Sequence, residues 1–485
     1  MKLITRHLAS VWLLAAACGA LAQDAGSTHL RVLATHDFHG ALEARSSARS
    51  RGKELGGAAA LEDTLRKAAQ DCQCTTLRVD GGDQMQGTLL SNLRHGEAVV
   101  KLFNALSLDA AAIGNHELDW GVDVFEQRLR EARYAWLAAN VYQRSDGKRA
   151  AWAKPYTVLE RDGLRIGIIG YATVETPGTL RPQTTAPYQF RGGYAGIKDA
   201  LASVWQQQPD FVALVAHAGG ACTPKACSGE LVELAEQLPP GSVHLIVGGH
   251  EHTSGQGVVN GIPIIRAGAN GQALAVIDLY RQPDGSRRFK METTPVVAEK
   301  SAANSSLATL LAPYLAEAET LGKTPVVTLR QTLSASEQGN RTLGNLIAEA
   351  QRLSAGADIG LHNPGGVRAD LLKGAVRYND VYRVLPFGNV VTKVAITGAA
   401  LKALAGRTSR YYWANLQLVG NKGKTSVRLG DGSEIDDGKV YSVAMPDFLA
   451  QGGDGLKQLI GLPQTDEGIT VLDAFVTYLS THTVP

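Results

Sequence analysis

Apolar and polar positions alternate in one repeated pattern between residues 29 and 300. Short apolar segments, of the length of buried strands, end in turns rich in glycine, aspartate or histidine. The predicted strands cover residues 30–35, 76–79, 110–113, 136–140, 165–170, 211–216 and 244–247. Apolar residues at helical spacing lie between them, as at Leu61 and Leu65 or at Val99 and Phe103. Strands that alternate with helices predict a layered α/β domain.

One long helix is predicted over residues 303–322. Its apolar stripe consists of Leu307, Leu310, Leu311, Tyr314, Leu315 and Ala318. Gly322 and Pro325 end the helix, because glycine and proline do not continue helical geometry. We therefore predict a linker helix between two domains.

The remainder of the chain has the size of an ordinary second domain. It opens with a strand at 325–329 and a helix at 343–353, and it shows no internal repeat or low-complexity tract. The predicted boundaries are residues 23–302 for the first domain, 303–324 for the linker and 325–485 for the second domain.

Composition and charge narrow the function. The chain has 485 residues, of which 44% are hydrophobic and 19% charged, so a disordered chain is excluded. The net charge is 48 − 46 = +2. Lys2 and Arg6 supply both excess charges, so residues beyond 22 are neutral overall. A chain that binds nucleic-acid polymers generally needs a basic surplus, so this class is disfavoured.

The first 22 residues have the pattern of an export signal. Lys2 and Arg6 precede an apolar run at residues 8–17, and Ala20-Leu21-Ala22 forms a small-residue cleavage site. The run is too short for a membrane span, and no later stretch resembles one. We expect a periplasmic or secreted protein. A lipoprotein attached through Cys18 is the second interpretation, because Leu14 lies one place too far back for a good lipobox.

Four cysteines remain beyond the signal, which suggests disulfides in an exported chain. Cys222–Cys227 is the preferred pairing, since it closes a short loop. Cys72–Cys74 would close a small ring, so free thiols there remain an alternative. A metal site at the cysteines is a third possibility, although the polar motifs elsewhere supply better ligands.

Five polar clusters follow predicted strands of the first domain. They are residues 35–40 (THDFHG), 81–84 (GGDQ), 114–119 (GNHELD), 216–219 (AHAG) and 248–252 (GGHEH). In layered α/β folds, ligands bind where strands end. Each cluster alone is more simply a capped turn or a hydrogen-bonded histidine, but five on successive strands indicate one site.

Carboxylate, amide and imidazole groups together suit divalent cations such as Zn²⁺, Mn²⁺ or Mg²⁺. The candidate ligands are Asp37, His39, Asp83, Asn115, His217, His250 and His252, a set large enough for two ions if one carboxylate bridges them. Asp37/His39 and His250/His252 are i,i+2 pairs, whose side chains we expect on one face of an extended backbone.

These clusters resemble the metallophosphatase half of the 5′-nucleotidase family. The resemblance implies a layered β-sandwich flanked by helices. It also implies that Asp37, His39 and His252 bind one metal, that Asn115, His217 and His250 bind the other, and that Asp83 bridges both. Some family members carry glutamine at the place of His252, a difference that could alter metal preference.

The resemblance further implies that His116 and Asp119 form a catalytic dyad. A carboxylate fixes the tautomer of a histidine and stabilises its cation, which agrees with that role. Glu117 could compete as the partner of His116 or be a solvated charge. Two metals clamp a phosphoryl group, and a metal-bound hydroxide would attack the phosphorus. His116 would stabilise the transferring oxygens or protonate the leaving group.

The second domain resembles the same family through four segments. They are residues 343–347 (LGNLI), 363–368 (NPGGVR), 385–389 (LPFGN) and 447–455 (DFLAQGGDG). The resemblance implies a smaller α/β substrate-binding domain, in which Phe387 and Phe448 sandwich a nucleobase. Asn363 and Asp454 would contact base or ribose, and Arg368 phosphate. Without the resemblance, the phenylalanines would be ordinary core residues. Arg341 is either a phosphate-binding arginine or a surface charge.

The predicted function is removal of the 5′-phosphate of nucleotides by a two-metal hydrolase with a small-molecule nucleotide substrate. The alternatives are a 2′,3′-cyclic nucleotide phosphodiesterase with 3′-nucleotidase activity, a UDP-sugar hydrolase, and a nucleotide-binding protein without turnover. The sequence leaves the native metal, the preferred leaving group and the oligomeric state open.

Overall fold

The computed structural model describes residues 27–46, 53–222, 227–298, 305–335, 342–421 and 424–484. The predicted signal segment and Arg341 lie outside these residues. Within the described residues, no helix combines the length and the apolar character needed to cross a membrane.

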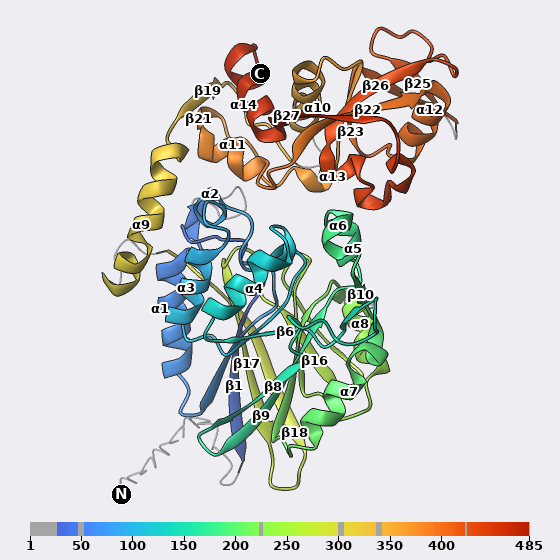
Figure 1. Ribbon diagram of the computed structural model, residues 1–485. Coiled ribbons are helices and arrows are strands. Elements are labelled where there is room, and N and C mark those ends of the chain that lie inside the picture. Colours follow the sequence, from blue (N-terminus) through green and yellow to red (C-terminus); the bar gives the residue numbers. More distant parts are fainter. Residues whose placement is uncertain are drawn as a thin grey trace, which may run out of the picture.

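Two six-stranded sheets form the centre of the first part of the chain (Figure 1). The first has the order β18 (Arg287–Pro295), β17 (Ala273–Arg281), β1 (Thr28–Thr35), β4 (Thr75–Asp80), β5 (Ala110–Ala112) and β6 (Ala135–Leu137). The second has the order β15 (Gly255–Val259), β16 (Ile262–Arg266), β14 (Leu245–Gly248), β11 (Phe211–His217), β9 (Leu164–Ala172) and β8 (Tyr156–Arg161). The predicted strands of the repeated pattern are thereby confirmed.

The inner faces of the two sheets share one apolar core. Val32 and Val79 of the first sheet belong to the same buried cluster as Ile168 and Val247 of the second. Helices cover the outer faces, with α1 (Ala58–Gln70), α3 (Glu97–Ala105) and α4 (Val122–Glu131) on one side and α7 (Gly193–Trp205) and α8 (Glu230–Gln237) on the other. This arrangement confirms the layered β-sandwich flanked by helices.

Short elements complete this part. They are β2 (Arg45–Ser46), β3 (Glu54–Leu55), α2 (Leu89–Asn92), β7 (Val141–Gln143), α5 (Thr176–Thr179), α6 (Pro182–Thr185), β10 (Tyr188–Phe190), β12 (Ala221–Cys222), β13 (Cys227–Ser228) and a 3₁₀ turn at His116–Leu118.

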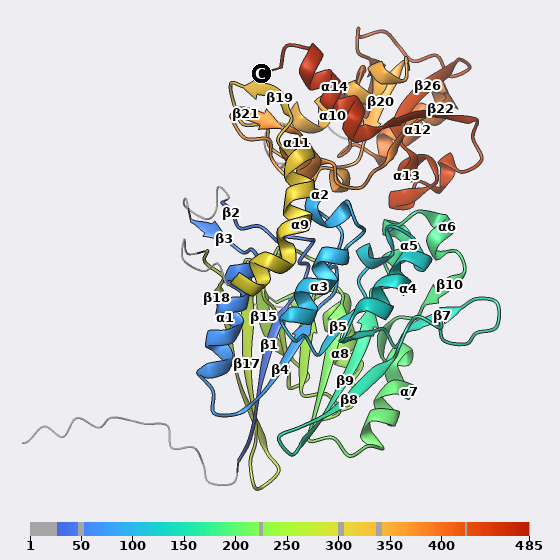
Figure 2. The same cartoon turned by 60° about the vertical axis from the view of Figure 1, so that its left-hand side comes forward.

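Helix α9 (Ser305–Gly322) runs from the first part of the chain to the second (Figure 2). Its apolar face packs on the core of the first part, where Leu307 and Leu311 are buried. Tyr314 donates a hydrogen bond to Glu97 of α3 at 2.6 Å. The helix therefore lies at the predicted position, anchored by its N-terminal half.

The second part contains a five-stranded sheet with the order β23 (Tyr412–Ala414), β20 (Ile359–His362), β26 (Val440–Pro446), β22 (Val390–Thr397) and β27 (Gln464–Thr470). One face packs against α10 (Thr342–Ser354), α11 (Tyr378–Val384) and α14 (Val471–Thr481). The other packs against α12 (Gly398–Arg407) and α13 (Asp447–Ala450). The remaining elements are β19 (Pro325–Leu329), β21 (Gly374–Arg377), β24 (Leu416–Asn421), β25 (Lys424–Leu429) and 3₁₀ turns at Pro364–Gly366, Gly453–Gly455 and Lys457–Leu459.

Candidate metal centre and nucleotide cavity

The predicted metal ligands of the first part lie together beyond the carboxyl ends of the parallel strands. Asp37 and His39 follow β1, Asp83 follows β4 and Asn115 follows β5. His217 ends β11, and His250 and His252 follow β14. Because β1, β4 and β5 are parallel, as are β11 and β14, each set of strand ends meets at one edge of its sheet.

The ligand side chains form two adjacent groups. Asp37, His39 and His252 make up the first, and Asp83, His217 and His250 the second. Asp83 Oδ2 lies 3.2 Å from His217 Nε2 and 3.9 Å from His39 Nε2, so this carboxylate lies between the groups. Asn115 Oδ1 joins the second group at 3.1 Å from His217 Nε2. The geometry therefore suits a carboxylate shared by two ions.

The side chains of these two groups are arranged in a way that suits cation binding. Asp37 Oδ1 is buried without a hydrogen-bond partner, yet lies 3.7 Å from His39 Nε2 and 3.6 Å from His252 Nε2. His39 Nδ1 donates to the Gln86 carbonyl and His217 Nδ1 to the Gly81 carbonyl, both at 2.8 Å. Each ring therefore directs Nε2 toward the carboxylate of its group, the orientation that ligating histidines adopt.

The backbone at the ligands differs from the prediction. Asp37 and His39 have φ of 48° and 49°, and His250 has φ of 71°. The expectation that extended backbone puts each i,i+2 pair on one face is therefore wrong. Tight left-handed turns bring the side chains together, and such conformations cluster at functional sites.

Asp83 is held in the ionised form. Burial opposes its charge, but the imidazoles of His217 and His116 hold its pKa well below the usual range. Its Oδ1 accepts the backbone N–H of His116 at 2.8 Å. A Cβ at position 114 would collide with this carboxylate, which explains why glycine stands there.

The two residues of the predicted dyad lie within hydrogen-bond distance of each other. His116 Nδ1 lies 2.9 Å from Asp119 Oδ2. Burial disfavours the imidazolium, but the Asp119 and Asp83 carboxylates outweigh it and raise the pKa of His116. Both residues line the cavity that lies between the first and second parts of the chain, so a substrate bound there can reach the imidazole.

Glu117 has a different role from those expected. It is 1% exposed, so it is not a solvated charge. Its carboxylate accepts the backbone N–H groups of Asp83, Gln84 and Gly114 at 2.7–2.9 Å. Burial, and then the charge of Asp83, raise its pKa to about 8. Glu117 thus fixes the two ligand loops. In the sequence, the only indication of this role is that Glu117 lies between the predicted site residues His116 and Asp119.

His36 is a second residue that the sequence analysis missed. Its Nε2 accepts the Gly268 N–H at 2.7 Å, so Nδ1 carries the proton and donates to Asp37 Oδ2 at 2.5 Å. This contact occupies Oδ2 of Asp37. The other oxygen, Oδ1, faces His39. Glu175, also unforeseen, lies 2.9 Å from His250 Nε2.

A cavity of about 910 Å³ extends from the two candidate ligand groups to the second part of the chain. Both parts line it. The first contributes Asp83, Asn115, His116, Asp119, His250 and His252, and the second Asn363, Arg368, Phe387, Phe448 and Asp454. Phe387 and Phe448 are half-buried and both line this cavity, and Phe448 also packs on the core of the second part. Asn363 Nδ2 donates to Asp454 Oδ2 at 2.8 Å.

Contacts across the cavity hold the two parts together. Asn92 Nδ2 donates to the Pro386 carbonyl at 2.9 Å, which places the Phe387 loop beside the dyad. Arg181 forms an ion pair with Asp447 at 3.0 Å. Arg368 Nη2 lies 3.3 Å from His252 Nε2, so this arginine borders the first ligand group.

The cysteines differ in part from expectation. Cys72 and Cys74 are joined in a disulfide, so the alternative of free thiols there is wrong in this state. Cys227 is disulfide-bonded, and it lies opposite Cys222 in the β12–β13 pair.

Comparison with known proteins places this fold and site in context. Residues 320–460 match the family model described as 5′-nucleotidase, C-terminal domain. Protein UshA of Escherichia coli is 29% identical, with 96% of this chain and 93% of that protein covered. A 5′-nucleotidase of Vibrio parahaemolyticus is 27% identical over 99% of this chain and 95% of that protein.

Among solved structures, a 5′-nucleotidase precursor from Thermus thermophilus matches with a TM-score of 0.80 and 25% identity, covering 93% of this chain and 96% of that one. The chain is an enzyme of the class that hydrolyses phosphoric esters. The resemblance to the 5′-nucleotidase family, first seen in the motifs, is confirmed over nearly the whole length.

Proposed function

We propose that this protein is a two-metal hydrolase that removes the 5′-phosphate of nucleotides. One observation carries this proposal. A single cavity is lined by residues of the ligand groups, by the His116–Asp119 pair and by Phe387 and Phe448. The names of the relatives, 5′-nucleotidases among them, support the substrate class.

Two divalent cations, when bound, would clamp a phosphoryl group and acidify an attacking water. Asp37, His39 and His252 would hold one cation, and Asn115, His217 and His250 the other. Asp83 would serve both. The proposed ligand set could bind Zn²⁺, Mn²⁺ or Mg²⁺, since all three accept oxygen and nitrogen ligands.

The remaining residues would bind and orient the substrate. His116, whose cation Asp119 stabilises, would donate to the transferring oxygens or to the leaving oxygen. Phe387 and Phe448 would contact the base, Asn363 and Asp454 the base or ribose, and Arg368 the phosphate. Arg341, outside the described residues, remains a proposed second phosphate ligand.

The proposal also covers location and organisation. Residues 1–22 would direct export, and the enzyme would act in the periplasm or as a secreted protein, rather than as a lipoprotein through Cys18. The catalytic domain would comprise residues 23–302, the linker 303–324 and the nucleotide-binding domain 325–485.

A substrate panel on metal-reconstituted protein tests the function. Consumption of AMP, followed by chromatography of substrates and products, should exceed that of 3′-AMP, 2′,3′-cyclic AMP and UDP-glucose. Preference for the cyclic or 3′ compound, or for UDP-glucose, would assign the protein to the corresponding alternative activity.

An amide substitution at Asp119 tests the proposed dyad. Asp119→Asn should retain the bound cations and slow AMP hydrolysis about 10²–10⁴-fold, the usual contribution of an acid–base group. Loss of cations from this variant would show that Asp119 is a ligand or a structural residue instead.

A further inference from the structure

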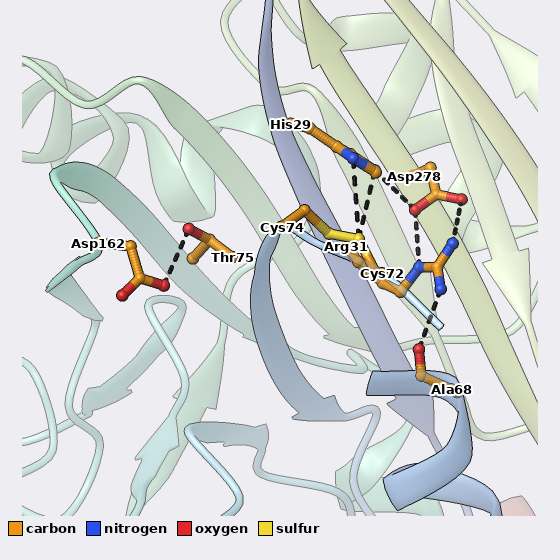
Figure 3. Close-up of a disulfide and its surroundings, with 8 residues drawn as sticks. All are labelled: His29, Arg31, Ala68, Cys72, Cys74, Thr75, Asp162 and Asp278. Carbon is orange, nitrogen blue, oxygen red and sulfur yellow. Dashed lines mark hydrogen bonds and ion pairs between the residues drawn. A yellow bond between two sulfur atoms is a disulfide. The ribbon is translucent and has the colours of Figure 1, made fainter. Parts of the chain in front are cut away.

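A cluster of potential ligands lies at the far end of β1 from the catalytic centre (Figure 3). It consists of His29 on β1, Asp278 on β17, and Cys72 and Cys74 just before β4. One ligand atom from each lies within 4.8 Å of all the others. At the usual rise per residue of a strand, about 20 Å separates His29 from the end of β1 at Thr35, which precedes Asp37. The cluster is therefore independent of the hydrolytic site.

Asp278 holds the ring of His29 in one orientation. Its Oδ1 lies 2.8 Å from His29 Nε2, and Arg31 donates to both of its oxygens at 2.8 and 2.9 Å. The ring also stacks on Tyr280, with centroids 4.3 Å apart. Because Asp278 only accepts, Nε2 carries the proton and Nδ1 presents a lone pair. A histidine whose other nitrogen donates to a carboxylate is the usual arrangement of a metal ligand.

The Cys72 sulfur lies beside the His29 ring, slightly closer to Nδ1 than to Nε2, which is 4.0 Å away. Cys72 Sγ lies 3.7 Å from His29 Nδ1, and a disulfide joins it to Cys74. In a tetrahedral zinc site with bonds of about 2.3 Å to sulfur and about 2.0 Å to nitrogen, neighbouring ligand atoms lie about 3.5 Å apart. The sulfur–nitrogen separation in this cluster already has that size. Both cysteines are only partly buried, so a reductant can reach them.

We propose that reduction of Cys72–Cys74 creates a zinc site in this cluster. Cys72 Sγ, Cys74 Sγ and His29 Nδ1 are its ligands, Asp278 is the carboxylate that orients His29, and water fills the fourth position. A dithiol reductant supplies two electrons and two protons to the disulfide and becomes a disulfide itself. Zinc then displaces the two thiol protons, and His29 keeps its Nε2 proton.

The ion would replace one cross-link by another. The disulfide joins two cysteines within one loop, whereas the zinc would join that loop to β1. A ligand that binds only the folded state stabilises it, so zinc should raise the unfolding temperature of the reduced protein. The site therefore couples the redox state of the loop to metal binding and to stability.

Cobalt titration of the full chain tests this proposal. The protein is reduced with a phosphine, desalted without oxygen and titrated with Co²⁺, which substitutes for zinc and absorbs strongly when bound to thiolate. None of the seven proposed catalytic ligands is a cysteine, so this absorption reports sulfur ligands only. Reduced protein should take up one equivalent with thiolate–cobalt absorption that Zn²⁺ abolishes, and oxidised protein should show none.

Variants identify the ligands. Cys72→Ser and Cys74→Ser should each abolish or strongly weaken the absorption, whereas the control Cys222→Ser/Cys227→Ser should retain it. Asp278→Asn should weaken cobalt binding about 10–100-fold, as loss of an orienting carboxylate does. His29→Phe, which keeps an aromatic ring beside Tyr280 and allows the disulfide, should lose the site while the oxidised chain stays folded by circular dichroism.

The proposal is overturned if reduced wild-type protein shows no thiolate–cobalt absorption, whether it remains folded or unfolds. It is also overturned if the absorption survives His29→Phe and Cys72→Ser unchanged, or disappears only in the Cys222→Ser/Cys227→Ser control.

Discussion

Phe387 of the second part of the chain stacks on His116 of the first, with ring centroids 5.6 Å apart and planes inclined by 25°. The Phe387 side chain thus touches the proposed dyad directly, and Arg368 lies 5.5 Å from the centre of its ring. A change at Phe387 would disturb the dyad and the nucleotide cavity together. Phe448, which also lines the cavity, is the better position for separating base binding from chemistry.

We predict that Phe448→Ala weakens the use of AMP about 5–150-fold in kcat/KM. Stacking of a base on an aromatic side chain contributes about 1–3 kcal/mol, and the variant removes it. Hydrolysis of a small phosphomonoester without a base should remain near the wild-type rate. Steady-state kinetics measure kcat/KM for both substrates.

Phe448→Tyr is the matched control, since it keeps an aromatic face and should keep AMP activity. If Phe448→Ala reduced both substrates equally, Phe448 would be acting as core rather than as part of the nucleotide site.

We predict that His36→Phe lowers the affinity for the catalytic cations about 10–100-fold, because the donor that orients Asp37 is lost. Titration of activity against a chelator measures this affinity. The control is His244→Phe, which removes another buried histidine that accepts a backbone N–H, from Val212 at 2.8 Å, away from the ligands. If the two variants were equally sensitive to the chelator, His36 would have no specific role in orienting Asp37.

The Asp278 cluster predicts a pH dependence of stability. Burial alone would raise the pKa of Asp278, but hydrogen bonds from His29 and Arg31 lower it to about 2. Since an unfolded aspartate has a pKa of about 3.9, ionised Asp278 contributes up to about 2.5 kcal/mol above that pH. This contribution should disappear as the pH falls through about 2.

Denaturant unfolding of wild-type protein and Asp278→Asn between pH 7 and pH 2 measures the effect. The difference in unfolding free energy should be largest near neutrality and shrink in acid. Asp146→Asn, at an exposed loop carboxylate, should show little difference at any pH. A difference for Asp278→Asn that stays constant with pH would mean that packing, not charge, is lost.

Much of the fold followed from local pattern. Strand β1 and helix α9 were predictable because buried apolar runs and a helical stripe leave clear periodicity. Clustering of Asp37 with Asp83 was predictable because β1 and β4 are parallel neighbours that end at one edge of the same sheet. His217 ends a strand of the other sheet, so its approach depends on how the two sheets pack.

Other features depended on contacts between distant segments. The left-handed turns at Asp37 and His39 have no periodic signature, so the sequence indicated an extended backbone. Glu117 is identified as structural only by the three backbone N–H groups that it accepts. The Arg181–Asp447 ion pair joins residues that are far apart in the sequence, and no short motif reports such a pair.

We propose that two cations, sharing Asp83, act with a nucleotide-binding domain to release phosphate. The most direct test of this proposal is to measure bound divalent metal and AMP hydrolysis together, in wild-type protein and in Asp83→Ala. Wild-type protein should bind two ions, lose activity with chelator and regain it with added metal. Asp83→Ala should lose metal and more than 100-fold of its activity, since even an orienting residue can cost 10–100-fold. Near-wild-type hydrolysis by Asp83→Ala with two bound ions would contradict the account.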